Sequence, residues 1–95
     1  MLSFTVRMRF PPEAKYDVEQ ALVELTRHSR LEPGCISYIA HFIEAEPDTV
    51  LIYEQYADDA ALDFHRGTPH FHQYAIGVLY QRMRDRNVEQ LIAVC

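Results

Sequence analysis

Apolar residues occupy every second position at the start of the chain, and polar residues lie between them. This alternation runs from Leu2 to Phe10, and Arg7 and Arg9 are among the polar residues. A period of two is typical of a β-strand with one buried face. Two prolines follow at once and lack the N–H group that a sheet requires, so the pattern predicts a first strand over residues 2–10.

The apolar spacing changes after the two prolines. From residue 13 onward apolar side chains recur at intervals of three and four, which is typical of an amphipathic helix. They are Val18, Ala21, Leu22 and Leu25. Pro33 and Gly34 then turn the chain, so the helix is predicted to end before them.

Two runs rich in β-branched and aromatic residues come next, over 35–43 and 49–57, with a turn-like segment over 44–48 between them. This arrangement predicts a β-hairpin. Both strands carry apolar groups on their two faces. In the first run Ile36, Tyr38 and Phe42 oppose Ile39 and Ile43, and in the second run Val50 and Ile52 oppose Leu51 and Tyr53.

The C-terminal half begins with two predicted helices. Asp58 is a good N-cap for a short helix with Ala61, Leu62 and His65 on one face, and residues 66–67 interrupt it. Thr68 can cap the next helix with Pro69 at its first position, where the missing N–H costs nothing. Its inward stripe is predicted to be Phe71, Tyr74, Ala75, Val78 and Leu79. Residues 86–95 are predicted as a last strand, although 88–94 also fit a helix.

This order of elements predicts a single α+β domain over residues 1–95, with a ferredoxin-like βαββαβ fold. Its four-stranded antiparallel sheet would carry the helices on one face. A sheet that is apolar on both faces leaves the other face uncovered, and such a patch usually marks an interface. The sequence therefore predicts a homodimer through the second sheet face, since two-fold dimers are the commonest oligomers.

Composition and charge limit the classes of binding partner and the cellular compartment that we expect for this protein. Fourteen acidic residues against nine basic ones give a net charge of −5, which opposes binding to nucleic acid. Arg7 interrupts any signal-like apolar start, and no stretch is long enough to cross a bilayer. Cys35 and Cys95 lack metal or redox spacing and are expected to be free thiols, with Cys35 a small packing group. We therefore expect a cytoplasmic protein without membrane contact.

Three segments resemble the signature blocks of the antibiotic biosynthesis monooxygenase family. They are residues 32–35 (EPGC), 53–56 (YEQY) and 65–71 (HRGTPHF), and the HxxTPH core is also similar to the autoinducer-2 phospho-isomerase branch. The resemblance covers essentially the whole chain. It implies a dimeric α+β barrel with a small pocket in each subunit between sheet and helices. Members include oxygenases that use no cofactor and act on quinols or polyketide phenols, haem-degrading enzymes and the sugar-derived signal isomerase.

Haem degradation is disfavoured by two departures from that branch. The first strand has arginines where the haem-degrading branch has an asparagine, and the chain contains no tryptophan. The chain also lacks the glycine patterns of nucleotide-binding loops. We therefore expect no cofactor.

His65 and His70 are the predicted catalytic residues. His65 shares a helix face with Leu62 and so points at the sheet, where a neutral imidazole can act as a general base. His70 lies in the first turn of the next helix, whose dipole favours a neutral ring. The alternative for His65 is a hydrogen bond in the core, and for His70 a capping or packing role. His72 is expected to face solvent.

Four of the predicted substrate-binding residues lie in the signature blocks, and the fifth, Tyr74, follows the last block. Aromatic rings suit an aromatic ligand. The five residues are Tyr53, Glu54, Tyr56, Phe71 and Tyr74. Packing alone is the alternative for the aromatic residues, and Glu54 can instead pair with an arginine or orient a histidine. The three histidines at 65, 70 and 72 straddle a helix break and match no zinc signature, so no metal is predicted. Arg7 and Arg9 can bind a carboxylate or phosphate, or form salt bridges.

Three functions follow from these residues. The first is a cofactor-independent monooxygenase acting on a small quinol, phenol or polyketide-like substrate, with His65 as its base. The second is an isomerase that enolises a small, phosphorylated hydroxyketone, and an arginine pointing into the pocket would favour it. The third is a dimer that binds a small molecule without catalysis.

Overall fold

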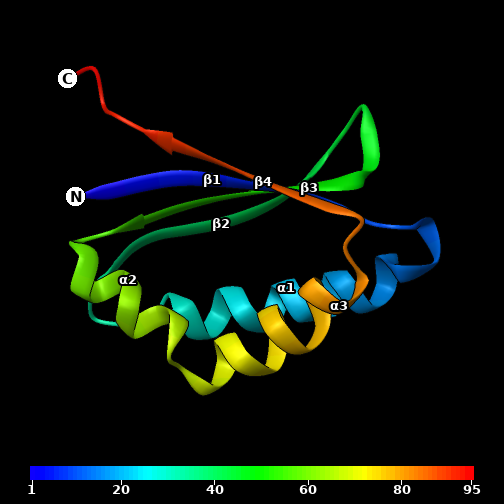
Figure 1. The fold of residues 1–95 in the computed structure, drawn as a ribbon, viewed down its shortest axis with the longest axis horizontal. Helices are drawn as coiled ribbons and strands as arrows, with labels where there is room; N and C mark the ends of the chain where they lie inside the picture. The colour runs from blue at the N-terminus through cyan, green and yellow to red at the C-terminus, as the bar shows by residue number, and fades with distance from the viewer.

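The computed structural model describes residues 1–95 as one sheet with every helix on the same side (Figure 1). The strands are β1 (Leu2–Arg9), β2 (Cys35–Ile43), β3 (Glu46–Tyr56) and β4 (Asp85–Leu91). The helices are the 3-10 turn η1 (Pro12–Ala14), α1 (Lys15–Ser29), α2 (Asp59–Arg66), the π-helix η2 (Phe71–Leu79) and the short α3 (Tyr80–Arg82). The predicted βαββαβ order is confirmed.

The sheet is antiparallel throughout, in the order β2-β3-β1-β4. Val6 lies at its centre, opposite Ile52 on one side and Val88 on the other. The first strand alternates as the sequence predicted, because Phe4, Val6 and Met8 are buried under the helices. This is the ferredoxin-like arrangement, and it leaves the opposite sheet face without helices (Figure 1).

The hydrophobic core fills the layer between sheet and helices. Its apolar side chains come from β1, β3, Tyr38 of β2 and the inward faces of α1 and η2. The largest fully buried ones are Tyr38, Tyr56, Met8, Leu25, Ile52, Leu79, Val18 and Val50. No helix in the structure is both long enough and apolar enough to span a bilayer.

Both predicted helix caps are present. The Asp58 carboxylate accepts a hydrogen bond from the Ala61 N–H at 2.9 Å. The Thr68 hydroxyl donates to the His65 carbonyl oxygen at 2.7 Å and accepts the Phe71 N–H at 3.2 Å. One side chain therefore joins the end of α2 to the following helix, which holds His65 and His70 in a fixed relation.

The segment predicted as a regular helix over the inward stripe is wound as a π-helix. The Tyr80 N–H donates to the carbonyl oxygen of Ala75, five residues earlier. Ala75 and Leu79 are buried, and the other predicted inward residues are partly buried, so the stripe is confirmed despite the wider winding. Such π-helical turns occur frequently at functional sites.

Three strand details differ from the prediction. The last strand ends at Leu91 rather than at residue 95, because Leu91 pairs with Ser3 and β1 offers no partner beyond Leu2. β3 begins at Glu46, inside the predicted turn, where Glu46 pairs with Ile43 across a bulge. A second register shift before Ser37 breaks the alternation, so Ile36, which was predicted to share a face with Tyr38, is 51% exposed whereas Tyr38 is buried.

Candidate active site

His65 is the centre of a buried polar cluster between α2 and the sheet. It is the only fully buried residue of α2, and it is 2% exposed. The last turn of α2 directs the ring toward β3, where it lies 5.1 Å from the Tyr56 ring and 5.9 Å from the Tyr38 ring, centroid to centroid. The predicted inward direction of His65 is confirmed.

Glu32 joins His65 to His70. Its carboxylate lies in the loop between α1 and β2, is 7% exposed, and accepts hydrogen bonds from both imidazoles. His65 Nδ1 is 2.9 Å from Glu32 Oε2, and His70 Nε2 is 2.5 Å from the same oxygen. A carboxylate can only accept, so His65 carries its proton on Nδ1 and its Nε2 is left with a free lone pair in the neutral ring.

The other nitrogen of His65 faces a second carboxylate. His65 Nε2 lies 3.8 Å from Glu54 Oε1, and the Tyr56 hydroxyl donates to that oxygen at 2.6 Å. Glu54 is 6% exposed, and its partners are a histidine and a tyrosine rather than an arginine. Five side chains therefore lie in a row in the order His70, Glu32, His65, Glu54, Tyr56, joined by hydrogen bonds except at the 3.8 Å approach between His65 and Glu54.

Burial sets the protonation of this cluster. It lowers the pKa of His65 below its ordinary value of 6.5, against the opposing effect of Glu32, so the ring is neutral near pH 7. Burial raises the pKa of Glu54 from 4.5 to about 7, against the hydrogen bond from Tyr56. It raises the pKa of Tyr56 well above its usual range, so this hydroxyl keeps its proton and donates. A neutral imidazole beside a carboxyl group that titrates near pH 7 can move protons in both directions.

A narrow cavity of about 30 Å³ lies beside this cluster, between the helices and the sheet. His65 and Glu54 line its polar end, and apolar core residues such as Phe4, Met8 and Leu79 line the rest. Such a volume holds about one water molecule. A ring-sized ligand therefore needs the side chains on the solvent side of the cavity to move.

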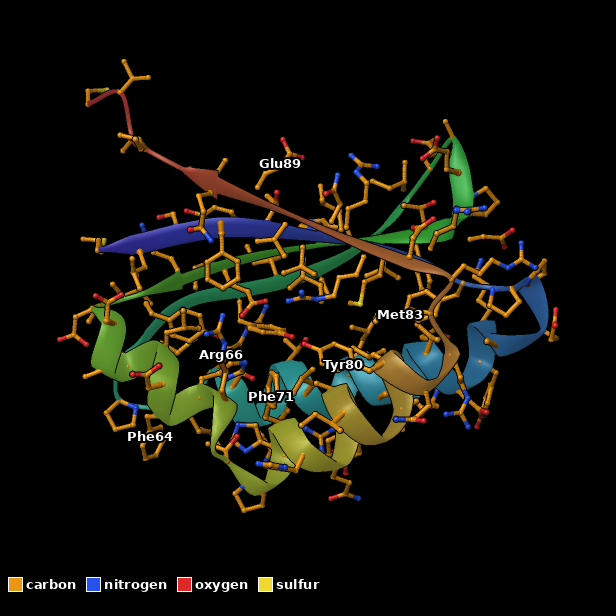
Figure 2. All side chains as sticks on the ribbon, in the orientation of Figure 1. Phe64, Arg66, Phe71, Tyr80, Met83 and Glu89 are labelled. Carbon is orange, nitrogen blue, oxygen red and sulfur yellow. The ribbon has the colours of Figure 1, made fainter.

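The solvent side of the cavity is formed by Arg66, Tyr80 and Arg86, which we call the mouth. Both arginines are exposed, and the Arg86 guanidinium lies over the Tyr80 ring at 5.4 Å. Figure 2 shows Arg66, Phe71 and Tyr80 in the space between the helix layer and the sheet, whereas Phe64 points away from the sheet. The two exposed arginine side chains can move aside more easily than the packed core.

The structure brings together most of the predicted site residues. His65, Glu54 and Phe71 line the cavity. His70 and Tyr56 do not line it, but they are hydrogen-bonded to Glu32 and Glu54 respectively. Two predicted substrate-binding residues lie elsewhere. Tyr53 is on the open sheet face, because neighbours in a strand point to opposite sides. Tyr74 stacks on His28 of α1, with centroids 6.5 Å apart, and does not line the cavity.

Sequence reasoning treated Glu32 only as part of a signature block. Its place in the cluster arises from two contacts with residues 33 and 38 positions away, which a local sequence pattern does not predict. His28 was also missed, although it stacks on His70 with ring centroids 5.4 Å apart. The signal available for Glu32 was its position in the EPGC block next to a turn, which suggests a residue carried by a loop rather than by a helix face.

The remaining predicted residues behave as packing or surface groups. Arg9 pairs with Asp85 at 2.8 Å, and Arg7 lies 3.7 Å from Glu46, both on the face away from the cavity. Burial raises the pKa of the Cys35 thiol to about 11, which keeps it protonated and unreactive. His72 is exposed, as predicted.

The donor atoms of Glu32, His65 and His70 lie within 4.8 Å of one another. Imidazole and carboxylate groups are common metal ligands, but tetrahedral ligands about 2.0–2.1 Å from an ion lie roughly 3.3 Å apart. Here the two nitrogens are 2.9 and 2.5 Å from the shared carboxylate oxygen. The geometry is that of direct hydrogen bonds, and the three side chains would have to separate to admit an ion.

The fold and the site together define a ferredoxin-like α+β domain with a histidine–carboxylate cluster between its sheet and its helices. The chain belongs to the antibiotic biosynthesis monooxygenase family, whose pattern matches residues 1–75.

The chain is also similar to a solved structure and to curated proteins. A crystal structure described as an antibiotic biosynthesis monooxygenase is 30% identical, covers 100% of both chains and has a TM-score of 0.92. The chain is 48% identical to Uncharacterized protein sll1783 of Synechocystis sp. over 48% of this chain and 31% of that protein. It is 33% identical to "Putative monooxygenase Rv0793" of Mycobacterium tuberculosis over 66% of this chain and 61% of that protein. The chain thus spans less than two thirds of these two curated relatives.

Proposed function

We propose that the protein is a monooxygenase that uses no cofactor and acts on a small quinol, phenol or polyketide-like substrate. The observation that supports this most is the buried His65, whose Nδ1–H is held by Glu32 and whose Nε2 is free to accept a proton beside the cavity. Membership of the antibiotic biosynthesis monooxygenase family supports this reaction class. The protein supplies a base, a desolvated site and orientation.

The reaction balances without a further reductant. For a substrate with an activated CH₂ group, His65 Nε2 takes one C–H proton, and the carbanion adds dioxygen to give a peroxide anion. The peroxide takes that proton back. His65 then removes the second C–H proton while the O–O bond breaks, and the leaving hydroxide receives this proton. One oxygen atom stays in the product as a carbonyl and the other leaves as water.

The test is oxygen uptake by EDTA-treated protein with menadiol or anthrone as substrate. We expect faster uptake than in buffer, one dioxygen per anthrone, and no further gain when zinc or iron is added back. A rate equal to that of buffer, or a rate that appears only with added metal, would contradict the proposal.

A second candidate is an isomerase for a small phosphorylated hydroxyketone, and the two mouth arginines favour it. Arg66 and Arg86 are not engaged in ion pairs, and guanidinium groups suit phosphate. The same His65 would then move a proton between neighbouring carbons. Transfer of solvent deuterium into a phosphorylated hydroxyketone, without oxygen uptake, would favour this candidate over oxygenation.

We further propose that two copies pair through the open sheet face. Ile39 of β2 lies on that face and is 42% exposed. It pairs with Tyr53 of β3, which is partly exposed, and Leu51 lies two residues before Tyr53 on the same face of β3. Helices cover only the other side of the sheet (Figure 1), so this apolar strip is free to meet its symmetric copy.

Light scattering should therefore give twice the chain mass of 11.1 kDa. Leu51→Lys removes about 2 kcal/mol of apolar burial from each copy. Because both copies in the dimer lose it, the dimer Kd should rise about 1,000-fold. Ile76→Lys is the matched control, because Ile76 is 37% exposed on η2, on the helix side. A monomeric wild type at micromolar concentration, or equal effects of the two variants, would contradict pairing through the sheet.

A further inference from the structure

The second half of the proposed reaction requires an acid as well as a base. While the O–O bond of the hydroperoxide breaks, His65 Nε2 is taking the remaining C–H proton, so it cannot give a proton to the leaving oxygen at the same moment. A hydroxide ion released into an apolar cavity would carry an uncompensated charge, which is costly. A neighbouring acid that donates as the bond breaks lets the oxygen leave as water.

Glu54 lies where such an acid is needed. It lines the same cavity as His65, and its Oε1 is 3.8 Å from His65 Nε2. The Tyr56 hydroxyl donates to Oε1, which leaves Oε2 as the oxygen that can carry a proton. Oε2 makes no hydrogen bond to the protein, and Ser29 Oγ is the only fully enclosed side-chain oxygen or nitrogen without a partner. Oε2 is therefore not enclosed, and a molecule in the cavity can meet it.

The other polar groups that line the cavity are poorer acids. Burial raises the pKa of Tyr38 well above its ordinary value of 10, so this hydroxyl keeps its proton. Tyr80 stands at the mouth, on the solvent side, and the arginines there do not release protons near neutral pH. Glu54 differs because burial raises its pKa to about 7, so a large share of the molecules hold it as a neutral acid near that pH.

We infer that Glu54 is the general acid that protonates the leaving oxygen of the hydroperoxide. The inference rests on the proposed function and adds a second catalytic residue to it. Glu54 meets the reacting peroxide itself, whereas Tyr56 acts through Glu54 and is a positioning residue.

Protons and electrons balance within the cavity. As the O–O bond breaks, its electron pair leaves with the outer oxygen, which takes the proton of Glu54 and departs as water. The C–H electron pair forms the carbonyl bond, and the C–H proton passes to His65 Nε2. The new water lies between the two side chains and carries this proton from His65 to Glu54 across a gap of 3.8 Å. The leaving hydroxide thus receives its proton by way of Glu54, and both side chains return to their starting forms.

Glu54→Gln separates the two halves of the reaction. Its amide oxygen can still accept from Tyr56 and its NH₂ group can still donate a hydrogen bond, but the amide does not release a proton. Addition of dioxygen needs only His65, so the variant should still consume dioxygen with anthrone. Its O–O bond should break slowly, and the hydroperoxide should accumulate.

The readout is the hydroperoxide fraction of the product after a single turnover with protein in excess. The reaction is quenched with acid, anthraquinone is measured by its absorbance, and hydroperoxide is measured by oxidation of ferrous iron. At about pH 6, where wild-type Glu54 is mostly protonated, we expect a hydroperoxide fraction of about a tenth or less in the wild type and about a half or more in Glu54→Gln. Glu44→Gln is the matched control, because it removes the same charge in the exposed turn between β2 and β3, and it should behave as the wild type.

A second measurement needs no loss of the carboxyl group. Because ionised Glu54 has no proton to give, the hydroperoxide fraction of the wild type should rise with pH, with its midpoint near pH 7. Besides burial, four groups set the pKa of Glu54, and His65 and Tyr38 also face it; the four are Tyr56, Arg86, Arg66 and Glu32. Tyr56→Phe removes a hydrogen bond that favours the carboxylate, so it should move the midpoint to higher pH.

Two results would overturn the inference while the proposed function stands. One is an equal hydroperoxide fraction in the wild type and Glu54→Gln, with both consuming dioxygen. The other is a wild-type fraction that stays constant between about pH 6 and about pH 8, while dioxygen is consumed. A wild type that consumes no dioxygen with anthrone or menadiol contradicts the proposed function, and the inference fails with it.

Discussion

Replacing His65 with glutamine should lower kcat/KM for quinol or anthrone oxygenation by about 10²–10⁴, the usual contribution of a positioned general base. The glutamine amide can still donate to Glu32, so the buried carboxylate keeps a partner and the fold is retained. Oxygen uptake measures the loss, and circular dichroism verifies the fold. His72→Gln, at an exposed position, should retain wild-type activity.

The pH profile gives an independent test of His65 as the base. The base works only when it is neutral, and burial lowers its pKa below 6.5. The acid limb of kcat/KM should therefore have its midpoint below pH 6.5, and it should disappear in His65→Gln. Glu54 adds an ionisation near pH 7, which Glu54→Gln should remove. A His65→Gln variant with more than half the wild-type rate and an unchanged profile would show that another group is the base.

Gly34→Ala should destabilise the protein by about 1–3 kcal/mol, the usual cost of overpacking. A Cβ atom at Gly34 would lie 2.3 Å from the Cβ of Ala61, so α2 would have to move away from the loop that carries Glu32. For a domain of this size the loss corresponds to a Tm lower by roughly 4–8 °C for each kcal/mol. Activity should fall as well, because α2 carries His65.

Two further variants identify the cause. Gly67→Ala is the matched control, because its Cβ would make only ordinary contacts of 3.7 Å with two carbonyl oxygens of α2. Ala61→Gly removes the methyl group with which the new Cβ of Gly34→Ala would clash. The double variant with both substitutions should therefore regain part of the stability lost in Gly34→Ala, as measured in a double-mutant cycle. Equal melting temperatures for Gly34→Ala and Gly67→Ala would show that the close approach is unimportant.

The alternation of residues along β3 is enough to refine part of the predicted site. Glu54 and Tyr56 share the buried face of this strand, and Tyr53, next to Glu54, must point to the other side. The alternation is visible in the sequence, and it assigns Tyr53 to the open face. Tyr74 is different, because its side chain reaches α1 rather than the cavity, and that depends on how two helices pack.

The sequence by itself determined the order of strands and helices, the helix caps and the inward direction of His65. These features depend on residues a few positions apart, and their periodicity reports which face is buried. Only the tertiary structure decided that Glu32 joins His65 and His70, and that the cavity beside them is small. The physical reason is that burial and contacts between residues more than thirty positions apart set the protonation of the site, and both exist only after the helices have packed on the sheet.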